Sequence, residues 1–212
     1  MSLILSLDLK NLTKANEVIN KTHQYLSFIK IGHVAISNFD IKQLETFGIP
    51  IMLDLKFFDI AVTIREAIFG YAKSINDLQI FTISSACQDE TIKISLEHSC
   101  NPYFVMHLSS DTLDINKSAI IKRVEKIISL GGQNFICPPF LIKDFRENFK
   151  NAINIATPGI RNDYEDNDHS MTISASVAKK LNTNYIIVGR PIYNSNKPNK
   201  IAKEYYDQFV SI

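Results

Sequence analysis

Three charged residues interrupt an otherwise apolar stretch of the sequence, IMLDLKFFDI, which covers residues 51–60. They are Asp54, Lys56 and Asp59. An apolar run of this length predicts a buried strand, and burying a charge is costly unless the charge is paired. Residues two apart on a strand project from the same face, so Asp54 and Lys56 are expected to lie together. They could form a plain salt bridge, or they could belong to a chemical site.

Other polar residues stand at or near the ends of further apolar runs. In chain order these are Asp8, Lys30, Ser84, Ser85, Ser109, Ser110, Arg161 and Arg190, the last preceded by Gly189. Lys30 and Asp8 would place further charges beside Asp54 and Lys56 if their runs are neighbouring strands. Because alternating like and unlike charges are a costly arrangement for stability alone, this grouping favours a chemical role over a structural one.

Apolar runs of strand length alternate along the whole chain with segments of helical period. The runs are ILSLD (4–8), FIKIG (28–32), IMLDLK (51–56), LQIFTI (78–83), YFVMHL (103–108), NFIC (134–137), INIAT (153–157) and YIIVG (185–189). Between them the pattern predicts helices over residues 13–22 with Thr13 as N-cap, near 41–47, over 62–73 and over 115–130. Strands that alternate with helices indicate right-handed βαβ units and a parallel sheet.

Eight such units predict an α/β fold of the (β/α)8 TIM-barrel type, with residues 1–212 as a single domain. A doubly wound open sheet is the structural alternative. Its glycine-rich turn after the first strand is missing, because SLDLKNLT contains no glycine. In a barrel the active site lies at the C-terminal ends of the strands, which is where the polar residues stand.

Two segments near the end of the sequence predict a phosphate site. TPGIR (157–161) and VGRPI (188–192) include the ends of the seventh and eighth runs, where barrels of this kind often bind phosphate. Gly189 allows the backbone to approach an anion closely, and the guanidinium of Arg190 offers a fork of donors. Gly-Arg-Pro also occurs in ordinary turns, so its position after the eighth run carries the prediction.

The overall composition limits the kinds of partner. The 212 residues include 23 basic and 22 acidic ones, a net charge of +1, and no cationic block, so binding to nucleic acid or to a membrane surface is not expected. The sequence shows no signal peptide, and its apolar runs are shorter than the ~20 residues of a membrane span. The cysteines, Cys87, Cys100 and Cys137, lack the spacing of a zinc or redox pair and indicate a cytoplasmic protein.

Taken together, these residues resemble the orotidine 5′-phosphate decarboxylase family of pyrimidine nucleotide synthesis. The resemblance covers residues 3–198, and its core is the family's Asp-x-Lys-x-x-Asp pattern, found here as Asp54, Lys56 and Asp59. TPGIR and VGRPI match in the right order and near the expected spacing. The resemblance implies decarboxylation of orotidine 5′-monophosphate to uridine 5′-monophosphate, a nucleotide substrate, and no metal or other cofactor.

The resemblance also implies a role for each matching residue. Lys56 would deliver the proton that replaces the carboxylate at C6, Asp54 would lie against that carboxylate, and Lys30 would hold the ribose. Asp59 and Thr63 would reach into the site of a neighbouring protomer, which makes the protein a homodimer. The other implied substrate contacts are Asp8 for a ribose hydroxyl, Ser109 and Ser110 for the base, and Arg161, Gly189 and Arg190 for the phosphate.

The sequence departs from the family pattern in three places. SSAC (84–87) replaces a His-Ala-Ser stretch, and Ala61 and Val62 replace a Pro-Asn pair. The loop between Arg161 and Met171 is shorter than usual and lacks a glutamine, for which Asn167 or His169 is the substitute. These changes concern the affinity for substrate more than the chemistry.

The expected mechanism relies on the protein's own charges, because loss of carbon dioxide from C6 leaves an anion that the ring cannot readily absorb. A preorganised ammonium group beside C6 would stabilise that anion. Two alternatives remain. One is a magnesium-dependent sugar-phosphate lyase or decarboxylase of the same barrel group, which shares the Asp-x-Lys-x-x-Asp pattern. The other is a non-catalytic phosphate-binding barrel.

Overall fold

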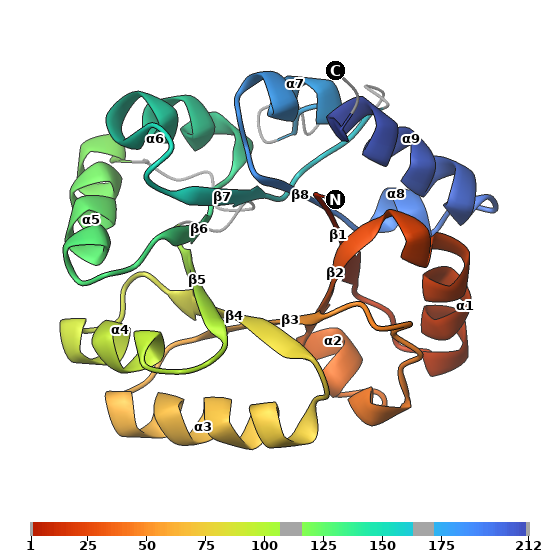
Figure 1. Ribbon diagram of the computed structural model, residues 1–212, viewed down its shortest axis with the longest axis horizontal. Coiled ribbons are helices and arrows are strands. Elements are labelled where there is room, and N and C mark those ends of the chain that lie inside the picture. Colours follow the sequence, from red (N-terminus) through yellow and green to blue (C-terminus); the bar gives the residue numbers. More distant parts are fainter. Residues whose placement is uncertain (1, 107–115, 163–171, 211–212) are drawn as a thin grey trace.

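Parallel strands form a closed barrel at the centre of the computed structural model, which describes residues 2–106, 116–162 and 172–210 (Figure 1). Each strand pairs with the next along the chain, and the last pairs with the first. In the described part of the chain the eight strands are β1 (Leu3–Leu7), β2 (Leu26–Gly32), β3 (Ile51–Phe57), β4 (Leu78–Ser84), β5 (Asn101–Val105), β6 (Asn134–Ile136), β7 (Asn154–Thr157) and β8 (Tyr185–Val188). The predicted (β/α)8 barrel is confirmed.

Helices surround the barrel and cover the outer face of the sheet (Figure 1). They are α1 (Leu12–Thr22), α2 (His33–Ile36), α3 (Ala61–Ser74), α4 (Asp89–Leu96), α5 (Lys117–Ser129), α6 (Ile142–Phe149), α7 (Ala175–Lys180), α8 (Arg190–Tyr193) and α9 (Pro198–Val210). Short 3₁₀ turns lie at η1 (His23–Tyr25), η2 (Ile41–Gln43) and η3 (Pro139–Leu141).

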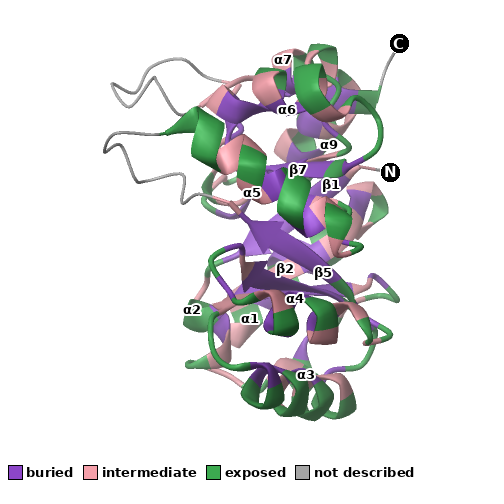
Figure 2. Cartoon of the chain, turned by 90° about the vertical axis from the view of Figure 1, so that its left-hand side faces the viewer, coloured by how far each residue is buried: buried purple, intermediate pink, exposed green. Residues whose placement is uncertain are grey.

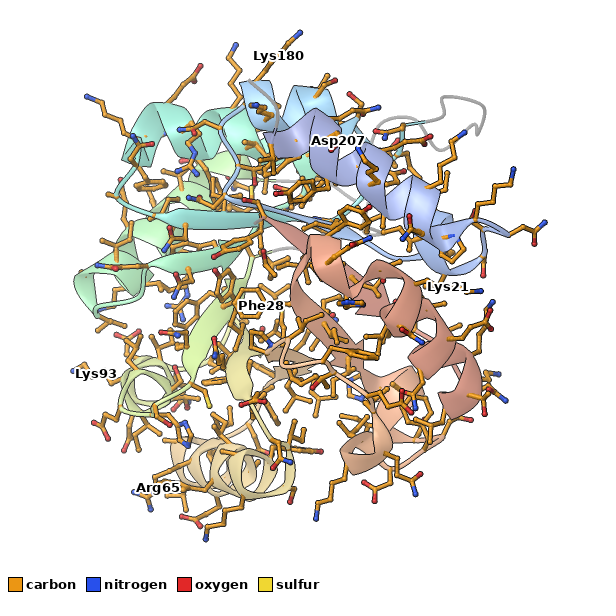
Figure 3. All side chains as sticks on the ribbon, turned by 45° about the vertical axis from the view of Figure 1, so that its right-hand side comes forward. Lys21, Phe28, Arg65, Lys93, Lys180 and Asp207 are labelled. Atoms are coloured by element: carbon orange, nitrogen blue, oxygen red, sulfur yellow. The ribbon has the colours of Figure 1, made fainter. Side chains whose placement is uncertain are left out.

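The strands are buried on both faces, which explains why they form nearly continuous apolar runs in the sequence (Figure 2). Alternate residues divide between two apolar clusters. One cluster fills the barrel and contains Ile4, Met52, Ile80, Tyr103, Val105, Ile136, Ala156 and Ile187. The other lies between the strands and the helices and includes Leu53, Phe81 and Phe104. In Figure 3, Phe28 lies toward the middle of the molecule, whereas Lys93 and Arg65 project outward from the helices.

Two details of the predicted helices are wrong. The first helix begins at Leu12, and its N-cap is Asn11, whose side chain accepts a hydrogen bond from the backbone N–H of Lys14 at 2.8 Å. Thr13 therefore lies inside the helix. The helix near residues 41–47 is only the 3₁₀ turn η2, and the chain then leaves helical geometry, with φ at 52° for Phe47.

Contacts with α1 explain why residues 41–47 do not continue as a helix. The side chain of Asn16 accepts a hydrogen bond from the backbone N–H of Glu45 at 3.1 Å and donates to the carbonyl of Gln43 at 3.2 Å. These backbone groups are thus satisfied by a side chain from another element. Helix propensity within the segment does not decide its conformation.

Candidate active site

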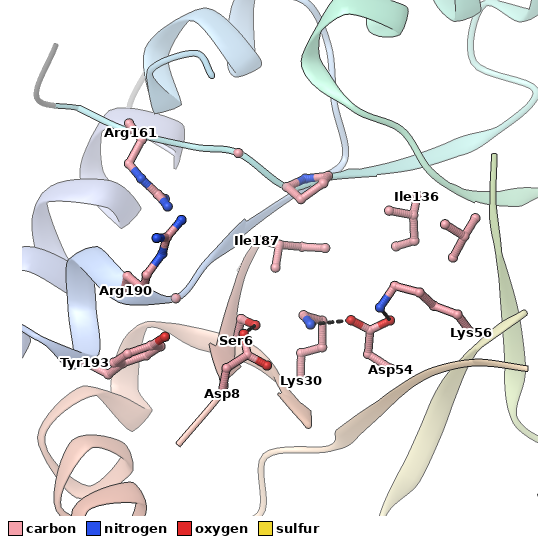
Figure 4. Close-up of a pocket in the computed structure, with 14 residues that line it drawn as sticks. Ser6, Asp8, Lys30, Asp54, Lys56, Ile136, Arg161, Ile187, Arg190 and Tyr193 are labelled. Atoms are coloured by element: carbon pink, nitrogen blue, oxygen red, sulfur yellow. Dashed lines mark hydrogen bonds and ion pairs between the residues drawn. The ribbon is translucent and has the colours of Figure 1, made fainter. Parts of the chain in front are cut away.

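Three charged side chains lie together where β2 and β3 end. Lys30 and Asp54 are almost buried, with side chains 11% and 12% exposed, and Lys30 donates a hydrogen bond to Oδ2 of Asp54. Lys56 donates to Oδ1 of the same carboxylate at 2.9 Å, and its side chain is 39% exposed. The structure therefore joins two ammonium groups through one carboxylate, as the sequence predicted for Asp54 and Lys56 (Figure 4).

The end of β3 is not a regular strand. Its register against β4 passes from Leu53 opposite Phe81 to Phe57 opposite Ile83, so β3 carries extra residues in a bulge. Within the bulge Lys56 has a φ of 50°, in the left-handed region that non-glycine residues seldom occupy. Backbone strain of this kind clusters at functional sites.

The two lysines determine the ionisation of Asp54. Burial by itself would raise the pKa of this carboxyl group. The charges of Lys30 and Lys56 and the hydrogen bonds from both ammonium groups outweigh burial and hold the pKa well below its usual range. Asp54 is accordingly a carboxylate at every pH near neutrality, and the array carries two positive charges against one negative charge.

Two arginines define the other end of the site. The guanidinium groups of Arg161, beyond β7, and Arg190, at the start of α8, point toward one another (Figure 4). An anion between them would contact both groups, and planar guanidinium groups suit phosphate oxygens. Gly189 precedes Arg190 at a crowded place, where a Cβ atom would lie 3.1 Å from the carbonyl oxygen of Ser6 and 3.2 Å from its Cβ.

One cavity of about 270 Å³ connects the charged array with the arginines. Its lining includes seven of the predicted site residues: Asp8, Lys30, Asp54, Lys56, Arg161, Gly189 and Arg190. Apolar side chains complete the wall, and Ile136 and Ile187 lie across the cavity from Asp54 (Figure 4). Low polarity on that side strengthens the field of the charges opposite.

Asp59 and Thr63 do not line this cavity, and both are exposed on the surface of their own chain. The Oδ1 atom of Asp59 accepts a hydrogen bond from the backbone N–H of Ile60 at 2.7 Å. Four further positions lie outside the described residues: Ser109, Ser110, Asn167 and the alternative His169. The strand-end residues Ser84 and Ser85 are not part of the cavity wall.

Sequence reasoning missed three residues of the site. Ser6 lines the cavity and donates a hydrogen bond to Oδ2 of Asp8 at 2.9 Å. Tyr193, on α8 beside Arg190, also lines the cavity; burial and the charge of Asp8 raise the pKa of its hydroxyl, while the charges of the arginines oppose this rise. Thr82 contacts Asp54 and Lys56. Strand alternation could have identified Ser6 and Thr82, since each lies two residues from a strand-end polar residue.

Fold and site together define a (β/α)8 barrel whose cavity has an ammonium–carboxylate array at one end and two arginines at the other. The chain belongs to the family described as Orotidine 5'-phosphate decarboxylase / HUMPS, whose model matches residues 1–205. The expected family is therefore confirmed.

Curated relatives match nearly the whole chain. Orotidine 5'-phosphate decarboxylase from Wigglesworthia glossinidia brevipalpis is 32% identical, and the match covers 99% of this chain and 98% of the relative. The protein of the same name from Buchnera aphidicola subsp. Baizongia pistaciae is 30% identical, with 94% and 92% covered.

Solved structures share the fold. The crystal structure of orotidine 5'-phosphate decarboxylase from Lactobacillus acidophilus has a TM-score of 0.83 at 23% identity, covering 99% of both chains. That of the Thermotoga maritima protein has a TM-score of 0.77 at 26% identity, covering 96% of this chain and 97% of the other. Within the described ranges, helices long and apolar enough for a membrane span are absent.

Proposed function

We propose that this chain decarboxylates orotidine 5′-monophosphate to uridine 5′-monophosphate, the last step of de novo pyrimidine nucleotide synthesis. The observation that carries the proposal is the cavity that has Lys30, Asp54 and Lys56 at one end and two arginines at the other. The full-length curated relatives bear the name of this enzyme. A substrate with a carboxylate near one end and a phosphate at the other matches this separation of charges.

In this function Arg161 and Arg190 bind the phosphate, and Asp8 binds a ribose hydroxyl with its carboxylate oriented by Ser6. Gly189 leaves the close packing against Ser6 undisturbed at the phosphate end. Binding energy from the phosphate, which takes no part in the bond changes, then holds the base against the charged array. Ser109, Ser110 and Asn167 remain proposed contacts to the base and the phosphate.

The chemistry takes place at C6 of the base. The bond from C6 to the carboxylate breaks, carbon dioxide leaves, and the electron pair stays on C6. The ammonium group of Lys56 stabilises this negative charge and then gives its proton to C6, while Lys30 and Asp54 keep it oriented. A preorganised cation in a cavity with an apolar wall needs little reorganisation during the reaction, and this mechanism uses no cofactor.

We also propose that the active unit is a homodimer in which Asp59 and Thr63 enter the partner's site. Asp59 lies outside its own cavity and stands among exposed apolar side chains: Phe58 is 69% exposed, Ile60 66% and Val62 56%. Apolar side chains grouped on a surface mark an interaction site. A two-fold dimer would cover them and carry each Asp59 toward the other protomer's Lys56.

A cytoplasmic location fits this function and the three cysteines, which are free and buried. We propose this location, and we also propose that residues 1–212 form one domain.

The direct test is the loss of ultraviolet absorbance when the purified protein is added to orotidine 5′-monophosphate, with and without EDTA. We expect turnover that EDTA leaves unchanged. Turnover abolished by EDTA and restored by magnesium would favour the sugar-phosphate lyase group instead. Binding of uridine 5′-monophosphate without any turnover would show that the protein is a non-catalytic phosphate-binding barrel.

A further inference from the structure

We propose that Thr82 is a positioning residue, whose hydroxyl group fixes Lys56 through both its main chain and its side chain. This inference rests on the function proposed above, because it assigns Thr82 a part in placing the ammonium group that protonates C6. Thr82 itself touches neither the reacting atoms nor the substrate; it acts through Asp54 and Lys56.

Thr82 lies on β4 inside the barrel. It is fully buried, and its partner in the register with β5 is Tyr103, a member of the cluster that fills the barrel. Ile80, two residues earlier on β4, belongs to the same cluster. The side chain of Thr82 therefore occupies the interior layer above Ile80, next to the end of β3.

The hydroxyl group of Thr82 makes two hydrogen bonds, each 2.9 Å long. It accepts from the backbone N–H of Lys56 and donates to Oδ1 of Asp54. Chemistry fixes these directions, since a backbone N–H can only donate and an ionised carboxylate can only accept. One hydroxyl thus links the main chain of Lys56 to the carboxylate that holds its ammonium group.

The bulge in β3 explains why a side chain is needed at this point. On β3 the N–H of Ile51 points toward β4 and donates to the carbonyl of Asp77, so in a regular ladder the N–H of Lys56 would point away from β4. The bulge, where the register passes from Leu53–Phe81 to Phe57–Ile83, turns that N–H toward β4 at a place where no ladder partner is paired with it. Thr82 lies opposite this gap and supplies the missing acceptor. It thereby stabilises a left-handed residue whose φ is 50°.

Lys56 depends on this support more than Lys30 does. The side chain of Lys56 is 39% exposed, against 11% for Lys30, so packing restrains it less. A long side chain in a single, partly exposed ion pair keeps much of its rotational freedom. Thr82 fixes both the backbone of Lys56 and the Oδ1 atom of Asp54. It thereby narrows the range of positions that the Nζ atom of Lys56 can adopt.

The test compares Thr82→Val and Thr82→Ser. Valine keeps the branched shape and removes the hydroxyl, whereas serine keeps the hydroxyl. We expect kcat for Thr82→Val to fall about 10- to 100-fold with KM changed less than about threefold, because small misplacements of catalytic groups cost rates of this size. Thr82→Ser should retain most of the wild-type kcat.

A matched control separates positioning from stability. Thr22 is also fully buried, and its hydroxyl donates to the carbonyl of Val18 at 2.8 Å within α1, away from the cavity. Thr22→Val should lower the thermal midpoint and leave kcat unchanged. If Thr82→Val does not fold, the pair Thr82→Ser and Thr82→Ala takes its place, since these differ by the hydroxyl alone.

Hydrogen exchange of the Lys56 amide gives a measurement that does not depend on turnover. We expect this amide to exchange at least about tenfold faster in Thr82→Val or Thr82→Ala than in the wild type and Thr82→Ser, since it loses its acceptor. Unchanged exchange, or a kcat equal in the serine and alanine variants, would overturn the inference. A wild type that shows a protected Lys56 amide without decarboxylating the nucleotide would contradict only the proposed function.

Discussion

The ammonium group of Lys56 donates to Oδ1 of Asp54 over 2.9 Å from a left-handed backbone position at the end of β3. The same carboxylate also accepts a hydrogen bond from Lys30. The array within one protomer therefore has an excess of one positive charge. That excess suits a site in which the substrate carries a carboxylate and the transition state develops a carbanion.

Replacing Lys56 with alanine should keep the fold and remove nearly all turnover. The substitution takes away the proposed proton donor together with the cation beside C6. Loss of one preorganised donor of this kind lowers kcat by about 100- to 1000-fold. The measurement is the steady-state rate of decarboxylation, with circular dichroism to show that the variant is folded.

Lys93→Ala is the matched control, since Lys93 is an exposed lysine on α4, outside the cavity. It should have the wild-type rate. A folded Lys56→Ala variant that kept more than about a tenth of that rate would show that another group protonates C6.

The stability contributed by Asp54 should disappear in acid. Burial raises the pKa of its carboxyl group, but Lys30 and Lys56 lower it further, to well below the ordinary value of 3.8. Because the pKa in the folded state lies below that in the unfolded state, the stabilisation is complete above the ordinary pKa and is lost as pH falls toward the folded pKa. The difference in free energy of unfolding between the wild type and Asp54→Asn should thus shrink below about pH 4.

Urea unfolding of both proteins between pH 3 and pH 7 measures this difference. Glu147→Gln serves as control, because Glu147 makes a surface ion pair of 3.8 Å with Lys143. Exposed ion pairs contribute little to stability. The Glu147→Gln variant should therefore have the same free energy of unfolding as the wild type across this pH range. The difference in free energy of unfolding between the wild type and Asp54→Asn could instead grow as the pH falls. That result would mean that the lysines do not hold Asp54 as a carboxylate.

The barrel could be predicted from the sequence because its strands are covered on both faces. That burial produces the apolar runs, and the polar residues at their ends follow from the position of the site at the barrel mouth. Seven predicted residues accordingly line one cavity. Asp59 is exposed and lies outside this cavity, and its place in a partner's site stays a prediction.

Features that depend on long-range contacts could not be predicted in the same way. The segment after η2 is held by Asn16 of α1, which a local helical pattern does not reveal. Strand alternation placed Asp54 and Lys56 together, but their contact also depends on a bulge and on Thr82 of the next strand. Bulges arise from the register between strands, and one sequence does not specify that register.

Arg190→Ala should harm the reaction mainly through phosphate binding. Its guanidinium points toward that of Arg161 at one end of the cavity (Figure 4). In the wild type, added phosphite should partly restore turnover of orotidine, the substrate that lacks the phosphate. The same addition should rescue Arg190→Ala poorly, because one of the two cations proposed to bind the dianion is missing.

The measurement is kcat/KM for orotidine as the phosphite concentration rises. Lys143→Ala provides a control for lost positive charge, since the side chain of Lys143 is 78% exposed and stands outside the cavity. Phosphite should restore the turnover of orotidine by this variant to the same extent as in the wild type. If phosphite rescued Arg190→Ala as strongly as the wild type, Arg190 would not be part of the phosphate site.

Mixing inactive Lys56→Ala and Asp59→Ala protomers should regenerate activity if sites are shared across a dimer. Asp59 lies outside its own cavity, beside the exposed side chains of Phe58 and Ile60. In a mixed dimer, one site has both Lys56 and the partner's Asp59, and the other has neither. Random equal mixing makes half of the dimers mixed, so activity should approach about a quarter of the wild-type value.

Subunit exchange has to be shown independently, for example by mass spectrometry of isotopically labelled protomers. Ile60→Asp supplies a second check, because a charge in the proposed apolar interface should produce monomers and lower activity together. If exchange is complete and the mixture stays as inactive as its parents, Asp59 acts within its own chain. Its exposure would then require a closing movement of residues 58–62 over their own cavity, and Ile60→Asp monomers would remain active.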